Sequence, residues 1–115
     1  MTRLLPEILG ERRAPGQVVL DLKLPWELAY FDGHFPGLPI LPGVVQIDWS
    51  VRFGRARLPL RGKFSAARNL KFMALIRPEA RLTLELTESA DHTRLSFAYV
   101  CGGRKCSSGM LVFGA

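Results

Sequence analysis

A proline-rich stretch of the chain, FDGHFPGLPILPGVVQIDW, contains two side chains that could perform acid–base chemistry. His34, one of two histidines, and Asp48 stand fourteen residues apart in it. Between them, Pro36, Pro39 and Pro42 recur at a spacing of three. Proline fixes φ and restricts the residue before it, so the stretch is stiff. It is therefore either a rigid connector with two incidental polar residues or a frame that holds a base and an acid.

His34 is the candidate base. A rigid loop can hold an imidazole at a set angle, which a general base requires. A single loop histidine can also be merely exposed or structurally bonded, and the loop alone does not distinguish these roles. His92 lies in the polar ADHT turn without a comparable frame, so we assign it no role.

Asp48 is the candidate acid, and it falls on a predicted helix. Two adjacent apolar stripes run along that helix: Val44, Ile47 and Val51, then Val45, Trp49 and Phe53. A helix that is apolar over so much of its circumference is mostly buried, and Asp48 shares the first stripe. Burial disfavours a charged carboxylate and favours a carboxyl group that keeps a proton to donate. A structural acid bonded to backbone groups or to an arginine fits the same pattern, and both interpretations stay open.

The start of the same helix offers a third group. Proline is favoured at a first helical position, so we expect the helix to begin at Pro42 and Gly43. The first N–H groups of a helix lack intrahelical partners, and the dipole is positive there. Gly43 has no side chain to block the approach of a carbonyl oxygen, which this end can stabilise as negative charge builds. A base, an acid and an oxyanion donor can together remove a proton α to a carbonyl and expel a β-substituent.

The remaining sequence predicts the sheet that positions this helix. Residues 4–9 are expected to form a short helix, and WELAYF a helical turn. Strands are expected in QVVLDLKLP before the long helix and in KFSAARNLKFMALI, RLTLELTE, TRLSFAYV and SSGMLVFG after it. Gly54 and Leu58-Pro59 should end the helix, and ESADHT and GGRK should form turns. This order predicts an α+β fold, a curved antiparallel β-sheet wrapped around one long central helix.

Length and composition are those of one folded domain, residues 1–115. Hydrophobic residues make up 48% of the chain and charged residues 23%, as in globular proteins. No apolar run approaches the ~20 residues of a membrane span, and the N-terminus lacks signal-peptide features, so we expect a cytoplasmic protein. Cys101 and Cys106 flank GGRK; packed thiols are expected there in a reducing cytosol. Without a neighbouring histidine they form a poor metal-site pattern.

The net charge of +6 suits an acidic protein, anionic lipid or nucleic acid as partner. The charges are scattered except for one cluster: Arg52, Arg55, Arg57, Arg61 and Lys63. A solvated helix end explains this cluster as well as a binding patch does, and no nucleic-acid motif accompanies it.

The segment GHFPGLPILPGV, with Asp48 four residues after it, resembles the signature of the β-hydroxyacyl-ACP dehydratases (FabA/FabZ-like), the hotdog-fold enzymes of fatty-acid and polyketide synthesis. The family pattern is close to G-H-F-P-G-x-P-I-x-P-G-V followed by Asp or Glu. A second, weaker likeness is LKFMALIRPEARLTL, which resembles the family's passage from a central strand through a proline turn into the next strand. The resemblance covers most of the chain after residue 15, and only its first motif is specific.

The resemblance implies a role for each matching residue. His34 would abstract the C2 proton of a 3-hydroxyacyl thioester, and Asp48 would protonate the departing C3 hydroxyl. The Gly43 N–H would bind the thioester carbonyl. The neighbouring substrate-binding candidates are Phe35, Pro42 and Val44.

The resemblance also implies how the enzyme assembles and what it meets. Two hotdog subunits form one continuous sheet, and each site takes its histidine from one subunit and its acid from the other. An acyl tunnel along the helix would admit the phosphopantetheine arm of an acidic acyl carrier protein, for which the basic cluster is a candidate contact. No cofactor other than this arm and no metal is implied.

Two features of the sequence indicate which branch of the family it resembles most. The acid is Asp rather than Glu, and aspartate occurs in the branch that also isomerises the double bond. The chain is short and is most similar to small stand-alone dehydratases, such as those of aryl polyene synthesis. There a dehydratase can pair with a related, different subunit.

Three other functions compete with the dehydratase. Hotdog acyl-thioesterases also carry a carboxylate on the central helix, but they usually lack GHFPG with its histidine. A non-catalytic subunit of a heteromeric dehydratase would be expected to lose His34 or Asp48, and both are present. A nucleic-acid binder is supported only by net charge.

Overall fold

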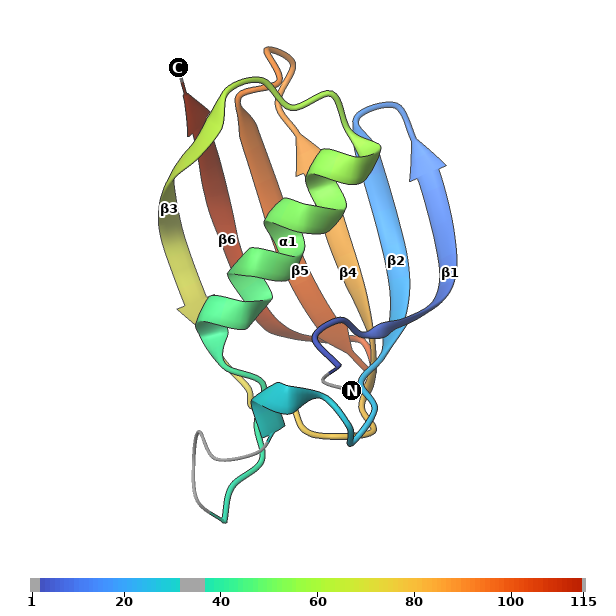
Figure 1. Cartoon of the computed structure of the whole chain (residues 1–115). Helices are drawn as coiled ribbons and strands as arrows, with labels where there is room; N and C mark the ends of the chain where they lie inside the picture. Colours follow the sequence, from blue (N-terminus) through green and yellow to red (C-terminus); the bar gives the residue numbers. More distant parts are fainter. Residues whose placement is uncertain (1–2, 32–36, 115) are drawn as a thin grey trace.

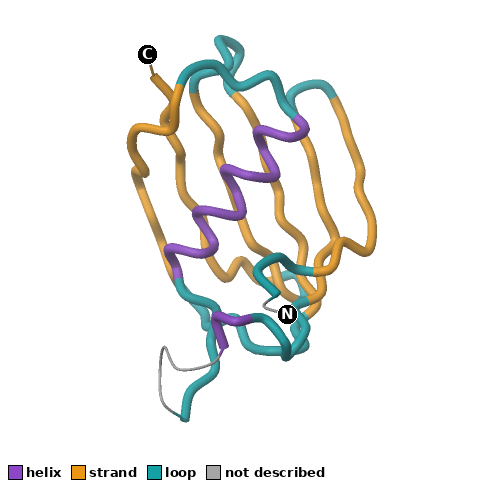
Figure 2. Tube along the Cα trace, viewed as in Figure 1, coloured by secondary structure: helices purple, strands orange, loops and turns teal. Residues whose placement is uncertain are grey.

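The computed structural model, which describes residues 3–31 and 37–114, contains one antiparallel sheet crossed by one long helix (Figures 1 and 2). The elements in chain order are β1 (Glu7–Ala14), β2 (Gln17–Lys23), the 3-10 turn η1 (Ala29–Phe31), α1 (Gly43–Arg57), β3 (Lys63–Phe72), β4 (Arg81–Glu88), β5 (Arg94–Cys101) and β6 (Arg104–Gly114). The six strands are ordered β1-β2-β4-β5-β6-β3. The predicted α+β class and the four strands after the helix are confirmed.

The expected short helix over residues 4–9 is wrong, because β1 begins at Glu7. β1 pairs with β2 from Glu7 opposite Lys23 to Ala14 opposite Gln17. Gly16, with φ +70°, closes the turn between them, a backbone conformation that glycine adopts without strain. Side chains along this edge strand are mostly exposed, so the alternation that marks a half-buried strand is missing from its sequence.

Side chains alternate across the sheet, and one face lies beneath α1 (Figure 1). The buried positions of the middle strands are Val18, Leu20 and Leu22 in β2, Leu82, Leu84 and Leu86 in β4, and Leu95, Phe97 and Tyr99 in β5. α1 covers them with Val45, Trp49 and Phe53. Burying an apolar side chain of this size contributes roughly 1.5–3 kcal/mol, so this contact between helix and sheet is the core of the fold.

The structure corrects the expected bounds and buried face of the helix. Pro42 is its N-cap rather than its first residue, and Gly54 lies inside the helix instead of ending it. The stripe of Val45, Trp49 and Phe53 is buried as expected. The other stripe is not: Val44 is 72% exposed, and Ile47 and Val51 are only half-buried. Of this second stripe, only Val44 faces solvent, and Ile47 and Val51 pack at the border of the core.

β3 is the edge strand next to β6, and it is bent as expected. Its register shifts twice, once between Phe64 and Ala66 and again between Arg68 and Lys71. No strand in the described part of the chain pairs with its other edge. Large apolar side chains are exposed along and just beyond it: Phe64, Leu70, Phe72, Met73 and Leu75. An unpaired edge with apolar side chains is a surface that another chain can cover.

No helix among residues 3–31 and 37–114 is long and apolar enough to cross a membrane.

Gly54 is where α1 approaches the sheet too closely for a side chain. A Cβ at this position would lie 2.6 Å from Cδ2 of Leu95, which is fully buried. We predict that Gly54→Val lowers the free energy of unfolding by at least about 2 kcal/mol through overpacking. Ala56→Val, on an exposed position of the same helix, should cost less than about 1 kcal/mol through helix propensity alone. Urea unfolding checks this, and equal losses in the two variants would contradict the close-approach argument.

Candidate active site

Asp48 lies on the second turn of α1, on the side facing away from the sheet. Its side chain is 50% exposed, and Arg52 Nε donates a hydrogen bond to Asp48 Oδ2 at 2.9 Å. The prediction that Asp48 lies on a buried stripe is therefore wrong for a single chain. Trp49, the next residue, points into the core, and successive helical residues are about 100° apart. Burial of Trp49 thus turns Asp48 outward.

Asp48 and Arg52 form the polar side of a small hollow of about 120 Å³. The lining residues are Leu4, Leu5, Tyr30, Asp48 and Arg52. Trp49 Nε1 donates to the carbonyl oxygen of Leu4 at 3.0 Å, which fixes the N-terminal segment against the helix. The carboxylate therefore stands at the edge of an apolar recess.

Within the described part of the chain, the first N–H groups of the helix lack acceptors, as predicted. Pro42 makes no side-chain cap, and its carbonyl oxygen accepts the Val45 and Gln46 N–H groups at 3.1 and 3.2 Å. The N–H groups of Gly43 and Val44 have no acceptor within residues 3–31 and 37–114. These two donors lie one turn before Asp48, at the positive end of the helix dipole.

Gly43 has a second structural reason to be glycine. A Cβ there would lie 2.8 Å from Cζ of Phe72, so the phenyl ring at the end of β3 already occupies that space. Phe72 is 49% exposed. One face of the helix start is thus covered by an aromatic ring, and the approach to Gly43 lies on another side.

The structure brings together only part of the predicted site. Asp48, Gly43, Pro42 and Val44 share the first two turns of α1 and its cap. His34 and Phe35 lie outside the described residues, so their roles stay predictions.

A buried polar network beneath the helix was missed by the sequence analysis. Gln46 Nε2 donates to the Leu41 carbonyl oxygen at 3.1 Å, and Gln46 Oε1 accepts from Ser107 Oγ at 2.6 Å. The main-chain carbonyl of Gln46 accepts from Ser50 Oγ at 2.8 Å and Tyr99 Oη at 2.7 Å. Burial raises the pKa of Tyr99 well above its ordinary value. The available signal was Gln46 itself, a polar residue on the apolar side of the helix.

The basic cluster divides into side chains with different partners. Arg52 bonds Asp48, and Arg57, 15% exposed, bonds Glu11 at 2.8 Å. Arg55 donates to the carbonyl oxygen of Gly62. The two members of the cluster that follow the helix, Arg61 and Lys63, are exposed. The cluster is therefore not one open patch, and its first member, Arg52, is bonded to the candidate acid, Asp48.

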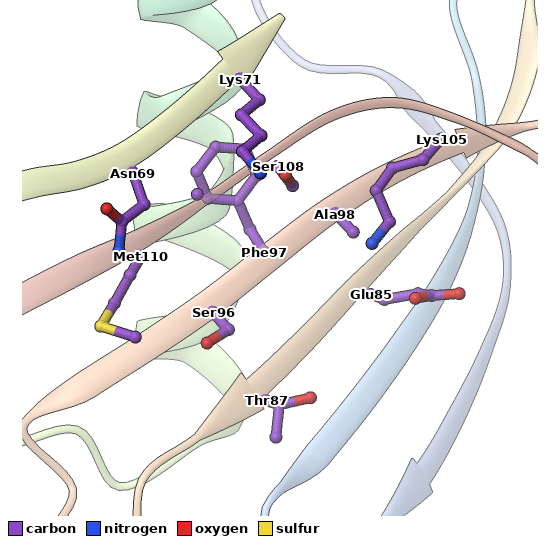
Figure 3. Close-up of a pocket in the computed structure, with 11 residues that line it drawn as sticks. Asn69, Lys71, Glu85, Thr87, Ser96, Phe97, Ala98, Lys105, Ser108 and Met110 are labelled. Atoms are coloured by element: carbon purple, nitrogen blue, oxygen red, sulfur yellow. The ribbon is translucent and has the colours of Figure 1, made fainter. Parts of the chain in front are cut away.

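A wider hollow, of about 330 Å³, lies on the sheet face opposite α1 (Figure 3). Lys71, Lys105 and Glu85 line it together with hydroxyl groups such as those of Ser96 and Ser108. None of the described members of the predicted site (Pro42, Gly43, Val44 and Asp48) lines it, and the sheet separates it from the helix. We therefore place the candidate site at the start of α1.

The two cysteines lie against each other at the β5–β6 turn. Burial, with the neighbouring Cys106 thiol, raises the pKa of Cys101 to about 12. Within residues 3–31 and 37–114, no group of three or more His, Cys, Asp or Glu side chains could hold a metal ion. The β5–β6 turn therefore contains packed thiols, as expected from the sequence.

Known proteins share both this fold and this sequence pattern. The solved dehydratase heterocomplex ApeI:P from Xenorhabdus doucetiae contains a chain that matches with a TM-score of 0.90 and 28% identity, over 97% of this chain and 100% of that one. An uncharacterised protein from Erwinia carotovora subsp. atroseptica matches with a TM-score of 0.84 and 33% identity, over 96% and 97% of the two chains. The 3-hydroxyacyl-[acyl-carrier-protein] dehydratase FabZ of Oenococcus oeni is 28% identical over 95% of this chain and 83% of its own length.

An antiparallel sheet around one helix is the architecture of the hotdog fold, and the likeness to the ApeI:P chain and to FabZ places the chain among the dehydratases of that fold. The chain belongs to the ApeI-like family, described as ApeI dehydratase, whose model matches residues 10–110.

Alkaline pH is predicted to weaken the fold through Tyr99. Burial raises the pKa of this phenol in the native state above its ordinary value of about 10. Above about pH 10 the unfolded chain releases the proton while the native state keeps it, so the free energy of unfolding falls by up to about 1.4 kcal/mol per pH unit. Below about pH 10 both states are protonated, and this contribution to pH dependence vanishes. Urea unfolding between about pH 8 and pH 11 should show a shallower decline for Tyr99→Phe than for wild type.

The control for this measurement is Tyr30→Phe, which removes a half-buried hydroxyl and should decline as wild type does. Parallel declines of wild type and Tyr99→Phe would show that Tyr99 does not set the alkaline limit.

Proposed function

We propose that the chain is a 3-hydroxyacyl-[acyl-carrier-protein] dehydratase, a hydro-lyase that converts a 3-hydroxyacyl thioester into the trans-2-enoyl thioester and water. The observation that carries the proposal is the placement of Asp48 one turn after the N–H groups of Gly43 and Val44, for which residues 3–31 and 37–114 supply no acceptor. Membership of a dehydratase family supports it. The pathway would be fatty-acid, polyketide or aryl polyene synthesis, in the cytoplasm.

The proposed reaction uses each group once. The Gly43 N–H binds the thioester carbonyl oxygen, which makes the C2 proton more acidic because negative charge on that oxygen is stabilised. His34 accepts the C2 proton, and the C2–H electron pair forms the C2=C3 bond. The C3–O bond breaks as Asp48 donates a proton to the hydroxyl, which leaves as water. Transfer of the proton from His34 back to Asp48 through solvent would complete the cycle.

Proton donation requires the contact between Asp48 and Arg52 to open. Both side chains are at least half exposed, so opening it leaves the core unchanged. Exposed ion pairs contribute little, roughly 0–1 kcal/mol. Opening this contact while it is still in water is therefore of small cost.

The site is proposed to be completed by a second subunit. No described strand pairs with the outer edge of β3, and Phe72 and Met73 at the end of this strand and Val44 at the helix start are exposed. A second chain paired along β3 would extend the sheet and cover these side chains. Each His34 would then work with Asp48 of the other chain. A homodimer is the simplest form, and the ApeI:P neighbour, which is a heterocomplex, makes a related subunit the alternative partner.

An acyl carrier protein is the proposed donor of the substrate, which arrives on its phosphopantetheine arm. The net charge of +6 supports binding of an acidic carrier. Of the basic cluster, Arg55, Arg61 and Lys63 are the exposed members not bonded to a carboxylate in the described residues. No further cofactor is required by the proposed steps.

The first test is loss of water from a 3-hydroxyacyl carrier protein, followed by mass spectrometry. We predict that wild type loses water, and that His34→Ala and Asp48→Asn each lower the rate at least ~100-fold, the usual scale for general acid–base groups. Asp21→Asn is the matched control, because Asp21 also bonds an arginine, Arg12, at 2.6 Å, and it lies between the buried Leu20 and Leu22, so it points to the sheet face opposite α1. It should retain the wild-type rate.

A free acid as main product would instead identify an acyl-thioesterase. Absence of any turnover would favour a non-catalytic subunit. Normal activity of His34→Ala would exclude the proposed mechanism.

The second test concerns shared sites. His34→Ala and Asp48→Asn subunits, mixed under conditions that allow exchange, should recover part of the wild-type rate, because a mixed dimer contains one site with both intact groups. Native mass spectrometry would verify the mixed dimers. Verified mixed dimers without recovered activity would show that each site is built within one chain.

A further inference from the structure

Gln46 is a buried amide whose two ends join different parts of the chain. It is 3% exposed and lies on the sheet side of α1, opposite Asp48. Nε2 donates to the carbonyl oxygen of Leu41 at 3.1 Å, and Oε1 accepts from Ser107 Oγ of β6 at 2.6 Å. A buried amide is costly unless both its groups are bonded, and here both are.

The Leu41 end of this link reaches the start of the helix. Leu41 N–H donates to the Ile76 carbonyl oxygen at 2.8 Å, so the backbone of residue 41 is held on both sides. The next residue, Pro42, has a fixed φ, and its carbonyl accepts the Val45 and Gln46 N–H groups. The peptide that carries the Gly43 N–H is thus held between the Leu41 bond and the first turn of the helix.

The docking of α1 on the sheet has a separate anchor. The main-chain carbonyl of Gln46, not its side chain, accepts from Ser50 Oγ and Tyr99 Oη. Val45, Trp49 and Phe53 supply the apolar contact. A change of the Gln46 side chain therefore leaves this anchor in place and removes only the bonds to Leu41, in the segment before Gly43, and to Ser107 of β6.

We propose that Gln46 is a positioning residue for dehydration: its side-chain amide, through the Leu41 carbonyl, sets the direction of the Gly43 N–H that receives the thioester oxygen. This inference rests on the function proposed above. Its chemical basis is that the N–H must point at the oxygen as charge develops, and a misplacement of about 1 Å can cost roughly 100-fold in rate.

The test compares the two ends of the amide. Gln46→Met keeps the length of the side chain and removes both hydrogen bonds, so the Gly43 N–H is no longer held toward the thioester oxygen. The contact of this N–H with the oxygen strengthens in the transition state, so kcat is expected to fall at least ~10-fold while KM changes less than ~3-fold. Ser107→Ala removes only the β6 bond and leaves the Leu41 bond. It should lower the melting temperature but keep kcat within ~3-fold of wild type. Circular dichroism at the assay temperature checks that each variant is folded.

Gln46→Glu adds a pH readout that packing alone does not produce. A protonated carboxyl group can donate to the Leu41 carbonyl oxygen, whereas the ionised form presents only acceptors. Burial favours the protonated form. The ratio of variant to wild-type kcat should therefore rise as pH falls, while the same ratio for Gln46→Met should stay level.

Two results would overturn the inference: wild-type kcat in folded Gln46→Met, or equal losses of kcat in Gln46→Met and Ser107→Ala. A level pH ratio for Gln46→Glu would count against the Leu41 bond as the operative one. Failure of the proposed function has a different signature, since wild type would then release no water or Asp48→Asn would remain fully active.

Discussion

The packing of α1 against the sheet is the constraint on which the rest of this molecule depends. The helix has one buried face, centred on Trp49, and its close approach to β5 leaves no room for a side chain at Gly54. Once that face is buried, the direction of every other side chain on the helix follows, because successive residues are about 100° apart. Gln46 and Ser50 point toward the sheet, and Val44 and Asp48 point away from it. The chemistry proposed for this helix is therefore located on the side that its own sheet does not cover.

Most of the fold could be predicted because its sequence patterns are local. Alternating leucines identify β2 and β4, and apolar residues at helical spacing identify α1. β1 could not be found in this way, because pairing with β2 forms it while its side chains stay exposed. The apolar stripe of Val44, Ile47 and Val51 was misassigned for a related physical reason. A hydrophobic pattern shows that a surface avoids water, but not whether the chain's own sheet or another surface covers it.

The candidate site was predictable to a different extent for each group. Asp48 was placed on the helix correctly and the helix start to within one residue, because proline, glycine and helical spacing determine them. The prediction that Asp48 is buried was wrong, because burial depends on which face of the helix meets the sheet. Gln46 was missed because its partners, Leu41 and Ser107, are 5 and 61 residues away. Nothing in the spacing of single residues indicates that a carbonyl oxygen and a β6 hydroxyl converge on one amide.

The contact between Gly43 and Phe72 means that two distant positions share one volume. The ring of Phe72 fills the space that a Cβ at position 43 would need, although one residue starts the helix and the other ends the edge strand. In evolution such positions are expected to vary jointly: a chain with a larger residue at the helix start needs a smaller one at the strand end. The size of the residue at position 43 and the size of the residue at position 72, at the end of β3, are thus sterically coupled. A relative that changes its β3 edge to suit a new partner would have to readjust the start of its helix as well.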